Sequence, residues 1–300
     1  MKVVVTGGAG FIGSNLVNAL IDDGECDVWC IDDESADNGG NFRWNPKANN
    51  VKASISDLSV VAGVVDGADT VFHMAAESRV QGCQDNPSKA VDTNVNSLAS
   101  LLHLCEIGKV KSFVYSSTSS VYGLRPPPHS VSTEPDLINM YACSKYCGEL
   151  ICKQYADKMK VIIFRYFNVF GPGCPSKGTY APVVSRFLEQ KSEGKPLTIV
   201  GTGEQSRDYV HVDTVVKLNK YAHSAPDDLS GNVYNVGMGW NWSVKEIADM
   251  ISSDQVHVPE RPNEAWSTLA DATSTMNDLG WDPDKDFDKL SLEAYIKGRV

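Results

Sequence analysis

Short apolar runs alternate with longer amphipathic segments through the first half of the chain. In the amphipathic segments, hydrophobic side chains recur at spacings of three and four, most clearly over residues 86–107 and again over 141–157, which predicts helices. The apolar runs predict strands at residues 2–6, 27–32, 50–55, 69–74, 112–116 and 160–165. Strands and helices that alternate in this way form βαβ units. We therefore expect an α/β fold with a Rossmann-type, doubly wound parallel sheet.

The regular alternation breaks after the Gly/Pro-rich residues 170–173. Ser243 and Glu246 have the spacing of a capping box and predict a helix that runs to about residue 251. The other elements expected in this half are a helix at 182–193, strands at 197–200 and 207–211, and a final helix at 287–297. We expect one domain over residues 1–172, to which later segments return, and a smaller, irregular α/β domain over 173–300.

The net charge and the hydropathy of the chain exclude some classes of binding partner. The chain has 27 Lys and Arg against 38 Asp and Glu, a net charge of −11, which argues against nucleic acid or an anionic membrane as a partner. An anionic ligand must then be held by individual arginines. The apolar stretches are far shorter than the ~18 residues of a membrane span, and the first strand begins at Lys2 without a signal peptide, so we expect a cytoplasmic protein.

The cysteines and histidines do not form a metal-binding pattern. The eight cysteines include no CxxC pair, and the six histidines include no HxxxH or HExxH arrangement. We expect neither a metal site nor a disulfide framework.

A glycine-rich turn follows the first predicted strand and opens a helix. The segment TGGAGFIGS at 6–14 carries Gly7, Gly10 and Gly13, which allow a tight turn, close approach of a pyrophosphate and tight helix–strand packing. The helix N-terminus adds unpaired N–H groups and a positive dipole end. This context predicts a dinucleotide site.

An acidic residue ends the second predicted strand at the distance that such a site requires. Asp32 lies nineteen residues after Gly13, where a carboxylate accepts hydrogen bonds from a ribose diol. With Asp33 and Glu34 it would repel a 2′-phosphate, so we expect NAD rather than NADP.

Tyr141 and Lys145 lie one helical turn apart on one face of a predicted helix. The pKa of a phenol, ~10, must fall by about 3 units for the group to act as a base near neutrality. The positive charges of a lysine ammonium and an oxidised nicotinamide could together supply that shift. The hydroxyl-rich segment 116–120 leaves the carboxyl end of a strand, where open α/β sheets bind ligands. Each pattern alone also fits an ordinary surface helix or polar loop.

Taken together and in this order, these segments resemble the extended branch of the short-chain dehydrogenase/reductase superfamily. Its members include NAD-dependent nucleotide-sugar epimerases and dehydratases, and the chain is most similar to the UDP-glucose 4-epimerase group. The matching segments are TGGAGFIGS at 6–14, HMAA at 73–76, Asn94, SSTSSVYG at 116–123, INMYACSK at 138–145, RYFNVFGP at 165–172, GTGEQSRDYVHVD at 201–213 and RPNE at 261–264.

The resemblance implies roles for particular residues. Thr118, Tyr141 and Lys145 would be catalytic, with Tyr141 as the base and acid. NAD would be bound in the domain at 1–172 by Gly7, Gly10, Phe11, Ile12, Gly13, Asp32, Asp33, Ser35, Ile55, Met74, Ala75, Ala76, Asn94, Ser116, Tyr141, Lys145 and Phe167. A UDP-sugar would be bound with the domain at 173–300 by Thr118, Tyr141, Asn168, Thr198, Val200, Arg207, Arg261, Glu264 and Thr268.

Departures from the family pattern bear on the reaction. Dehydratases and decarboxylases of the family usually carry an acidic residue just after the catalytic Thr, where this chain has Ser119 and Ser120. The absence of that acid favours 4-epimerisation of a UDP-hexose through a 4-keto sugar. A dehydratase or reductase of the superfamily is the alternative, and a non-catalytic NAD-binding sensor is a remote one. Ser54 replaces a frequent Asp on the adenine side, and Met140 replaces a frequent Pro.

Two further expectations follow from the resemblance. Thr268 stands where these epimerases set the room for the substituent at C2, and its small size predicts that N-acetylated sugars are accepted as well as UDP-glucose and UDP-galactose. The apolar stripe of 86–107 (Val91, Val95, Leu98, Leu102 and Cys105), together with Cys147, Leu150 and Ile151, predicts a homodimer paired through two helices.

Overall fold

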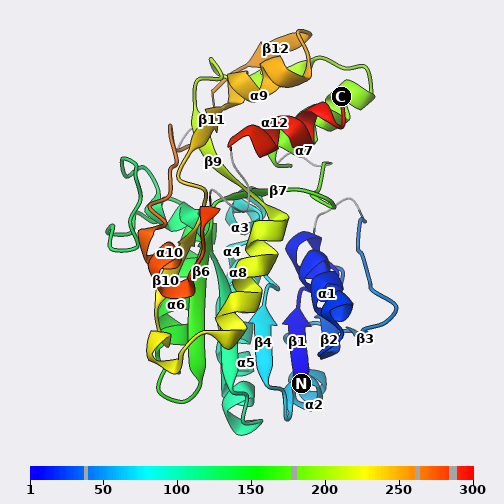
Figure 1. The fold of residues 1–300 in the computed structure, drawn as a ribbon, viewed down its shortest axis with the longest axis vertical. Coiled ribbons are helices and arrows are strands. Elements are labelled where there is room, and N and C mark those ends of the chain that lie inside the picture. The colour runs from blue at the N-terminus through cyan, green and yellow to red at the C-terminus, as the bar shows by residue number, and fades with distance from the viewer. Residues whose placement is uncertain (37–39, 177–180, 261–263, 284–288) are drawn as a thin grey trace.

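Seven parallel strands form the main sheet, in the order β10-β6-β5-β4-β1-β2-β3. The computed structural model describes residues 1–36, 40–176, 181–260, 264–283 and 289–300. The sheet strands are β1 (Lys2–Thr6), β2 (Asp27–Asp32), β3 (Asn49–Lys52), β4 (Thr70–His73), β5 (Ser112–Thr118), β6 (Lys160–Tyr166) and β10 (Val233–Val236) (Figure 1). The order is that of a doubly wound Rossmann sheet, so the predicted fold class is confirmed.

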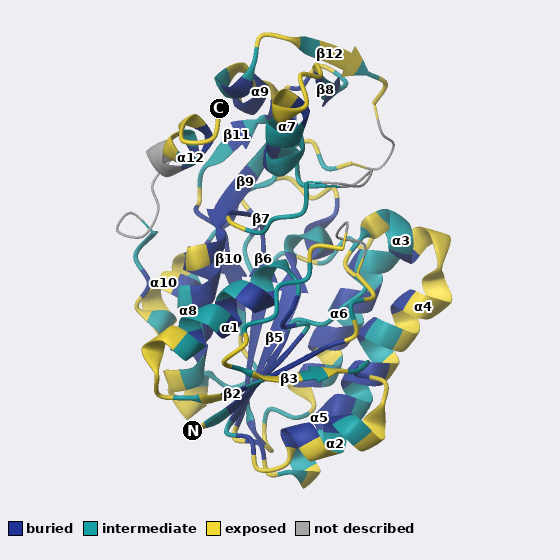
Figure 2. Cartoon of the chain, turned by 90° about the vertical axis from the view of Figure 1, so that its right-hand side faces the viewer, coloured by how far each residue is buried: buried dark blue, intermediate teal, exposed yellow. Residues whose placement is uncertain are grey.

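Helices cover both faces of this sheet. One face carries α1 (Phe11–Asp23), α8 (Val212–Ser224) and α10 (Thr273–Leu279), and the other carries α2 (Leu58–Val65), α5 (Ser97–Ile107) and α6 (Met140–Lys153). Figure 2 shows the strands buried between the two layers. Because both faces are covered, central strands such as Val3–Val5 of β1 are apolar without alternation and fully buried.

Two elements end earlier than their sequence pattern predicts. The predicted strand 50–55 ends at Lys52. The Ala53 N–H makes the last bond to β2, at the Asp32 carbonyl (3.1 Å), and the chain then leaves the sheet. The predicted helix 141–157 ends at Lys153. There the N–H of Gln154 donates to the carbonyl of Ile151, and this tighter i→i+3 turn ends the α-helix.

The predicted helix 86–107 is divided into three pieces. A short helix α4 (Pro87–Val91) is followed by a π-helical turn η1 (Asp92–Asn96) and then by α5. Within that turn, the Asn94 amide donates to the Glu77 carbonyl (3.0 Å) and to Ser144 Oγ (3.0 Å), and its oxygen accepts from the Glu77 N–H (2.8 Å). The wider turn therefore accommodates a buried side chain that bonds to two other segments, a feature that hydrophobic spacing does not show.

The remaining elements build a second layer above the carboxyl ends of the strands (Figure 1). A three-stranded sheet has the order β11-β9-β7 and a two-stranded sheet pairs β12 with β8. A separate apolar core joins these sheets to α7, α9 and α12. The bounds are β7 (Asn168–Phe170), α7 (Val183–Ser192), β8 (Leu197–Val200), β9 (Ser206–His211), β11 (Asn241–Ser243), α9 (Val244–Ile251), β12 (Gln255–Val258) and α12 (Lys289–Lys297). The predicted capping box of α9 is confirmed, with Ser243 and Glu246 bonded reciprocally.

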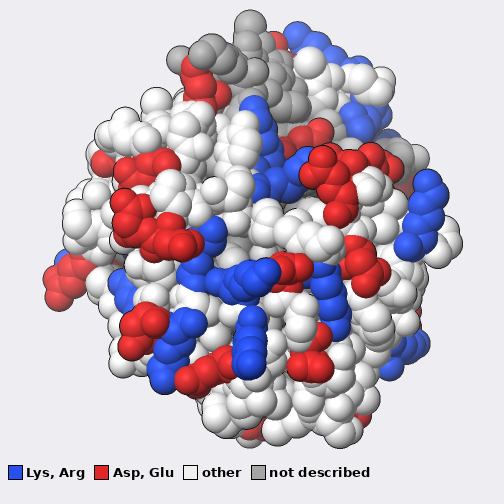
Figure 3. All heavy atoms as spheres, turned by 60° about the horizontal axis from the view of Figure 1, so that its bottom comes forward, with Lys and Arg blue, Asp and Glu red and all other residues white. Residues whose placement is uncertain are grey.

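The short elements that remain are α3 (Val80–Asp85) after β4, and the 3-10 turns η2 (Ser119–Tyr122) and η3 (Asp227–Leu229). Within the described ranges, no helix has the length and apolar character to cross a membrane. Figure 3 shows Lys and Arg mixed with Asp and Glu over the lower face, where Lys111 pairs with Asp69 (2.6 Å) and Lys158 with Glu106 (2.8 Å).

Candidate active site

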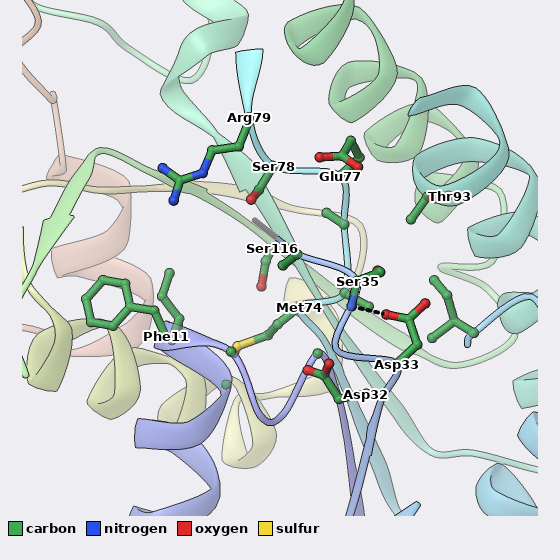
Figure 4. Close-up of a pocket in the computed structure, with 18 of the residues that line it drawn as sticks. Phe11, Asp32, Asp33, Ser35, Met74, Glu77, Ser78, Arg79, Thr93 and Ser116 are labelled. Carbon is green, nitrogen blue, oxygen red and sulfur yellow. Dashed lines mark hydrogen bonds between the residues drawn. The ribbon is translucent and has the colours of Figure 1, made fainter. Parts of the chain in front are cut away.

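A cavity of about 270 Å³ opens at the carboxyl ends of the central strands, where the strand order reverses between β1 and β4. Open α/β sheets bind ligands at such a reversal, because the loops of neighbouring strands separate there. The walls come from the turn after β1, the ends of β2, β4 and β5, and the first turns of α6. Figure 4 shows Phe11, Met74, Ser116 and Arg79 around this hollow.

The turn after β1 can be formed only by glycine at its closest contacts. A Cβ on Gly7 would lie 2.7 Å from the Ala75 nitrogen, and Gly7 has a φ of +68°. A Cβ on Gly13 would lie 2.2 Å from the Gly7 carbonyl oxygen, so Gly13 lets α1 pack against the turn. At Gly10 a Cβ would contact only the Gly7 oxygen, at 3.3 Å. Because Gly10 lines the cavity, a side chain there would fill the space beside the N-terminus of α1.

Asp32 and Asp33 hold the next loop beside the cavity. The Asp32 carboxylate accepts from the N–H groups of Ala9 (3.1 Å) and Glu34 (2.8 Å), and Asp33 accepts from Ser35 (3.0 Å; Figure 4). Burial raises the pKa of Asp32, while these two N–H bonds oppose that shift. Each carboxylate oxygen has a further lone pair, so Asp32 can also accept from a ribose hydroxyl. Glu34 is ion-paired with Lys52 at the rim.

Most residues predicted to hold the cofactor line this one cavity. They are Gly7, Gly10, Phe11, Ile12, Gly13, Asp32, Asp33, Ser35, Ile55, Met74, Ala75, Ala76, Ser116, Tyr141 and Lys145. Two others lie beside it. Asn94 is buried and bonded to Glu77 and Ser144, and Phe167 packs in an interior cluster with Val121, Tyr122 and Ala270. Asn94 therefore supports the wall through Glu77, whereas Phe167 is a core residue that follows the lining residue Tyr166.

Sequence reasoning missed the wall that follows β4. Glu77, Ser78, Arg79, Lys89 and Thr93 all line the cavity, and Lys89 is ion-paired with Glu77 at 2.7 Å. The rule that finds segment 116–120 also applies to Glu77–Arg79, because these residues belong to the loop at the carboxyl end of β4, whose last residue is His73. Other lining residues that were not predicted are Ile31, Ala36, Ala53, Ser54, Ser117, Tyr166, Pro175 and Pro182.

Thr118 and Tyr141 lie close together at one side of the cavity. Thr118 ends β5 and Tyr141 lies in the first turn of α6, and the Thr118 hydroxyl is near enough to the phenol to influence its pKa. Asn139 caps α6 by accepting from the Ala142 N–H (2.8 Å), which fixes the start of the helix. Burial raises the pKa of Tyr141 to about 12, while the Thr118 hydroxyl and the charge of Arg79 act in the opposite direction.

Lys145 lies one turn further along α6 and is buried. Burial lowers the pKa of its ammonium to about 8, and the nearby Glu149 carboxylate partly offsets that effect. At neutral pH the ammonium is therefore mostly charged, within a cavity that also carries Arg79 and Lys89.

Four of the predicted substrate residues form a second cluster, between the main sheet and the upper layer. Arg207 donates to Glu264 (3.0 Å), and the Asn168 amide lies 3.5 Å from Thr268 Oγ1. Thr268 Oγ1 also accepts from the Asp208 N–H (3.2 Å). Asp208 thus contacts this cluster through its main chain, and its side chain bonds to the same segment, at Ala270.

The Asp208 carboxylate is fully buried and accepts three backbone N–H bonds. The donors are Met238 (2.7 Å), Gly239 (3.0 Å) and Ala270 (2.9 Å). Burial raises the pKa of Asp208 to about 7, against the lowering effect of these bonds. The carboxylate fastens β9 to the end of β10 and to the segment that carries Thr268.

The other predicted substrate residues lie elsewhere. Thr198 and Val200 belong to β8, where Thr198 Oγ1 accepts from Gln190 (2.9 Å) and the Val200 carbonyl from Gln205 (2.9 Å). Arg261 falls outside the described residues. In the part of the chain that the structure describes, no three His, Cys, Asp or Glu side chains gather as a metal site.

Comparison with known proteins agrees with this site. Residues 3–237 match the profile of the NAD dependent epimerase/dehydratase family. The chain belongs to this family. NAD is the cofactor of this family, and solved relatives show which ligands the same fold binds.

Three relatives cover almost the whole chain. A putative UDP-glucose 4-epimerase of Methanocaldococcus jannaschii is 32% identical over 95% of this chain and 94% of its own length. The structure of a UDP-N-acetylglucosamine 4-epimerase from Methanobrevibacter ruminantium is 31% identical, with a TM-score of 0.89 over 99% of this chain and 97% of that one. A UDP-glucuronic acid 4-epimerase from Bacillus cereus, solved with UDP-glucuronic acid and NAD, is 28% identical, with a TM-score of 0.89 over 100% and 98%.

The residues present fit NAD. Gly7, Gly10 and Gly13 leave the space beside the α1 N-terminus that a pyrophosphate requires, and Asp32 offers an acceptor for a ribose diol. In this epimerase/dehydratase chain, Glu34 and Asp33 stand where a 2′-phosphate would come, which favours NAD over its phosphorylated form.

Replacement of Gly13 by Ala should weaken NAD binding. The new Cβ would overlap the Gly7 carbonyl oxygen, and overpacking of this kind costs about 1–3 kcal/mol, or a ~5- to 150-fold rise in Kd. NAD retained by the purified protein and fluorescence titration would measure the change. Gly63→Ala on α2 is the matched control, since its Cβ would meet nothing within 4 Å. Equal NAD binding in wild type and Gly13→Ala would contradict the assignment of this turn.

Proposed function

We propose that the enzyme inverts C4 of a UDP-hexose through a 4-keto sugar, acting on UDP-glucose and UDP-galactose and on the N-acetylated pair. The observation that carries this proposal is that Tyr141 and Lys145 line the same cavity one helical turn apart, with the Thr118 hydroxyl near the phenol. A phenol, a hydroxyl and an ammonium in this relation can remove and return the proton of a substrate alcohol.

In this mechanism each catalytic side chain handles a proton or a charge. The Tyr141 phenolate oxygen takes the proton of the 4-hydroxyl group and later returns it. Thr118 Oγ1 hydrogen-bonds to the same hydroxyl and keeps it aligned with the phenol. The Lys145 ammonium stabilises the phenolate form, because a positive charge beside the cavity favours the ionised phenol. Bound NAD supplies a hydride acceptor for C4 and, when oxidised, a further positive charge.

The nucleotide part of the substrate would lie against the second cluster. Arg207 and Arg261 would hold the diphosphate, Asn168 would contact the sugar diphosphate, and Glu264 would lie near the nucleotide. Thr198 and Val200, which belong to β8 and lie outside this cluster, are the other substrate residues that we propose. A guanidinium binds phosphate in a bidentate way, so the contact is local and the net charge of −11 does not prevent it. We therefore propose that residues 1–172 bind most of the cofactor and that residues 173–300 contribute Arg207, Glu264 and Thr268 to the nucleotide-sugar site.

Elimination of water is the competing reaction. The positions after Thr118 are Ser119 and Ser120, which form the 3-10 turn η2, and the Ser120 N–H donates back to Thr118 Oγ1 (3.1 Å). Neither serine carries a carboxyl group that could protonate a leaving hydroxyl. The residues at these two positions therefore favour epimerisation over elimination. Incubation with a panel of UDP-hexoses, followed by separation of the products, distinguishes the two reactions. Loss of water or consumption of NADH would favour the dehydratase or reductase.

Tyr141→Phe should reduce turnover by about 10²- to 10⁴-fold while NAD is retained. The ring would still pack at the start of α6, but no atom could take the proton. Steady-state kinetics with UDP-galactose and the NAD content would measure the two effects. Tyr146→Phe on the same helix is the control and should keep wild-type turnover. Near-wild-type turnover of Tyr141→Phe would exclude this phenol as the base.

Thr268→Tyr should selectively suppress activity on the N-acetylated sugars. The tyrosine ring would occupy the space next to C2 and raise the activation free energy for the N-acetylated sugar by about 1–3 kcal/mol. This lowers kcat/KM for that sugar ~10- to 200-fold relative to UDP-galactose. Thr268→Val controls for loss of the hydroxyl that accepts from Asp208 and Asn168. Wild-type protein that converts UDP-galactose but neither N-acetylated sugar would contradict the proposal for this wall.

We also propose that the enzyme is a homodimer paired through α6 and the α4–α5 segment. The structure narrows the surface that could pair. Leu98, Leu102 and Cys105 of the predicted stripe are fully buried on the sheet. The stripe residue Val91 is exposed, as is Leu150 on α6.

Light scattering at micromolar concentration should give twice the chain mass. Leu150→Glu should shift the protein towards the monomer, because a charge would be buried in an apolar interface. Leu124→Glu, on an exposed loop, is the control and should leave the mass unchanged. A strictly monomeric wild-type protein would refute the dimer.

A further inference from the structure

Tyr115 lies directly against Lys145, in the layer between β5 and α6. The Lys145 Nζ is 4.3 Å from the centre of the Tyr115 ring, and both side chains are buried. The Tyr115 hydroxyl also donates to the Lys145 carbonyl oxygen (3.2 Å). One side chain on β5 therefore contacts both the charged end and the backbone of this residue.

The ring is held where it is by its neighbours. A Cβ on Gly148 would lie 2.1 Å from the Tyr115 hydroxyl, so the ring occupies the space that a side chain at 148 would need. The His73 ring of β4 stacks with it, with centroids 5.9 Å apart and planes at 13°. The position of the ring is thus set by His73 and by the main chain of α6, and does not depend on the Lys145 side chain.

The ammonium needs such a contact because it is buried. Tyr141, Glu149 and Cys152 on α6, Cys83 on α3 and His73 on β4 are the titratable groups that surround it. Glu149 is bound in a bidentate way by Arg165 (2.9 and 2.7 Å) and accepts from Ser117. Its negative charge is therefore largely compensated by Arg165 and does little to stabilise the Lys145 ammonium. Burial lowers the pKa of His73 to about 3, which leaves that ring neutral.

An aromatic face attracts a cation through its quadrupole, and the attraction grows when both are removed from water. Burial also raises the pKa of Tyr115, so the phenol keeps its proton and makes no ion pair with Lys145. The contact is therefore between an ammonium and a neutral ring.

We propose that Tyr115 is a positioning residue that keeps Lys145 protonated and fixed beside the cofactor cavity through a cation–π contact. The inference rests on the proposed catalytic role of Lys145, and it assigns to β5 a second function besides carrying Thr118. An aliphatic side chain of similar size would pack at position 115 but would leave the ammonium without this partner.

The test compares Tyr115→Phe with Tyr115→Leu in the NAD-loaded protein. Competitive labelling with acetic anhydride over a range of pH, read by mass spectrometry, gives the pKa of Lys145 without any need for activity. Tyr115→Phe keeps the ring and should leave this pKa close to that of the wild type. Tyr115→Leu should lower it by about one unit. The alkaline limb of the pH–rate profile should move down by the same amount, since the charge is lost at lower pH.

An exposed lysine, Lys245 on α9, serves as the internal reference for labelling. A Lys145 pKa that is unchanged in Tyr115→Leu would overturn the proposal. A fall of the same size in Tyr115→Phe would also overturn it, because the hydroxyl bond to the Lys145 carbonyl would then be the active contact.

If Tyr115→Leu does not fold, fluorinated phenylalanines at position 115 keep the shape of the ring and withdraw charge from its face. A stepwise fall of the Lys145 pKa with fluorine content supports the cation–π contact, and no trend refutes it. A fall in this pKa without a shift of the pH–rate profile supports the contact and rejects the proposed role of Lys145. The two proposals can therefore fail separately.

Discussion

The buried ion pair between Glu149 and Arg165 fixes α6 on the main sheet. Arg165 on β6 binds both carboxylate oxygens of Glu149 on α6, and Ser117 on β5 donates to the same carboxylate. Three elements therefore meet at one carboxylate. Glu149 lies one helical turn after Lys145, and Ser117 directly precedes Thr118. Removal of either partner of the ion pair would leave a buried charge uncompensated, at a cost of about 3–5 kcal/mol. The position of Thr118 near Tyr141 depends on this register between β5 and α6.

The same network continues across the sheet to the upper layer. Arg165 donates to the Tyr122 hydroxyl (3.0 Å), which donates to Asn235 on β10 (2.6 Å). The Asn235 amide in turn donates to the carbonyls of His129 (2.7 Å) and Asp271 (3.0 Å). The last contact lies next to Ala270, whose N–H is bound by Asp208. Buried polar groups of this kind need hydrogen-bond partners, so the chain of bonds restricts how the segment around Ala270 can lie relative to α6.

The sequence predicted the parts of this molecule that depend on local rules. The strands β1 and β2, the glycine turn with Asp32, and the pair Tyr141 and Lys145 follow from spacing and from the end of a strand, and all line one cavity. The contributions that sequence reasoning missed come from contacts between distant segments. The π-helical turn accommodates Asn94 because Glu77 and Ser144 bind it, and Tyr115 meets Lys145 because Gly148 lets α6 approach β5. No spacing within either segment contains that information.

Thr268 and the pair Tyr141 and Lys145 are held by different parts of the structure. Tyr141, Lys145 and Thr118 are carried by the main sheet and α6, whereas Thr268 belongs to a segment that is bonded to β9. Two of these bonds use main-chain donors of the segment, from the Ala270 N–H to the Asp208 carboxylate (2.9 Å) and from the Thr268 N–H to the Ser206 carbonyl (3.1 Å). Main-chain donors do not depend on the side chain present, so these two bonds remain when residue 268 changes. The Thr268 hydroxyl adds bonds from the Asp208 N–H and the Asn168 amide, and only these are lost. A change at position 268 therefore acts on Asn168 and Asp208, and not directly on α6.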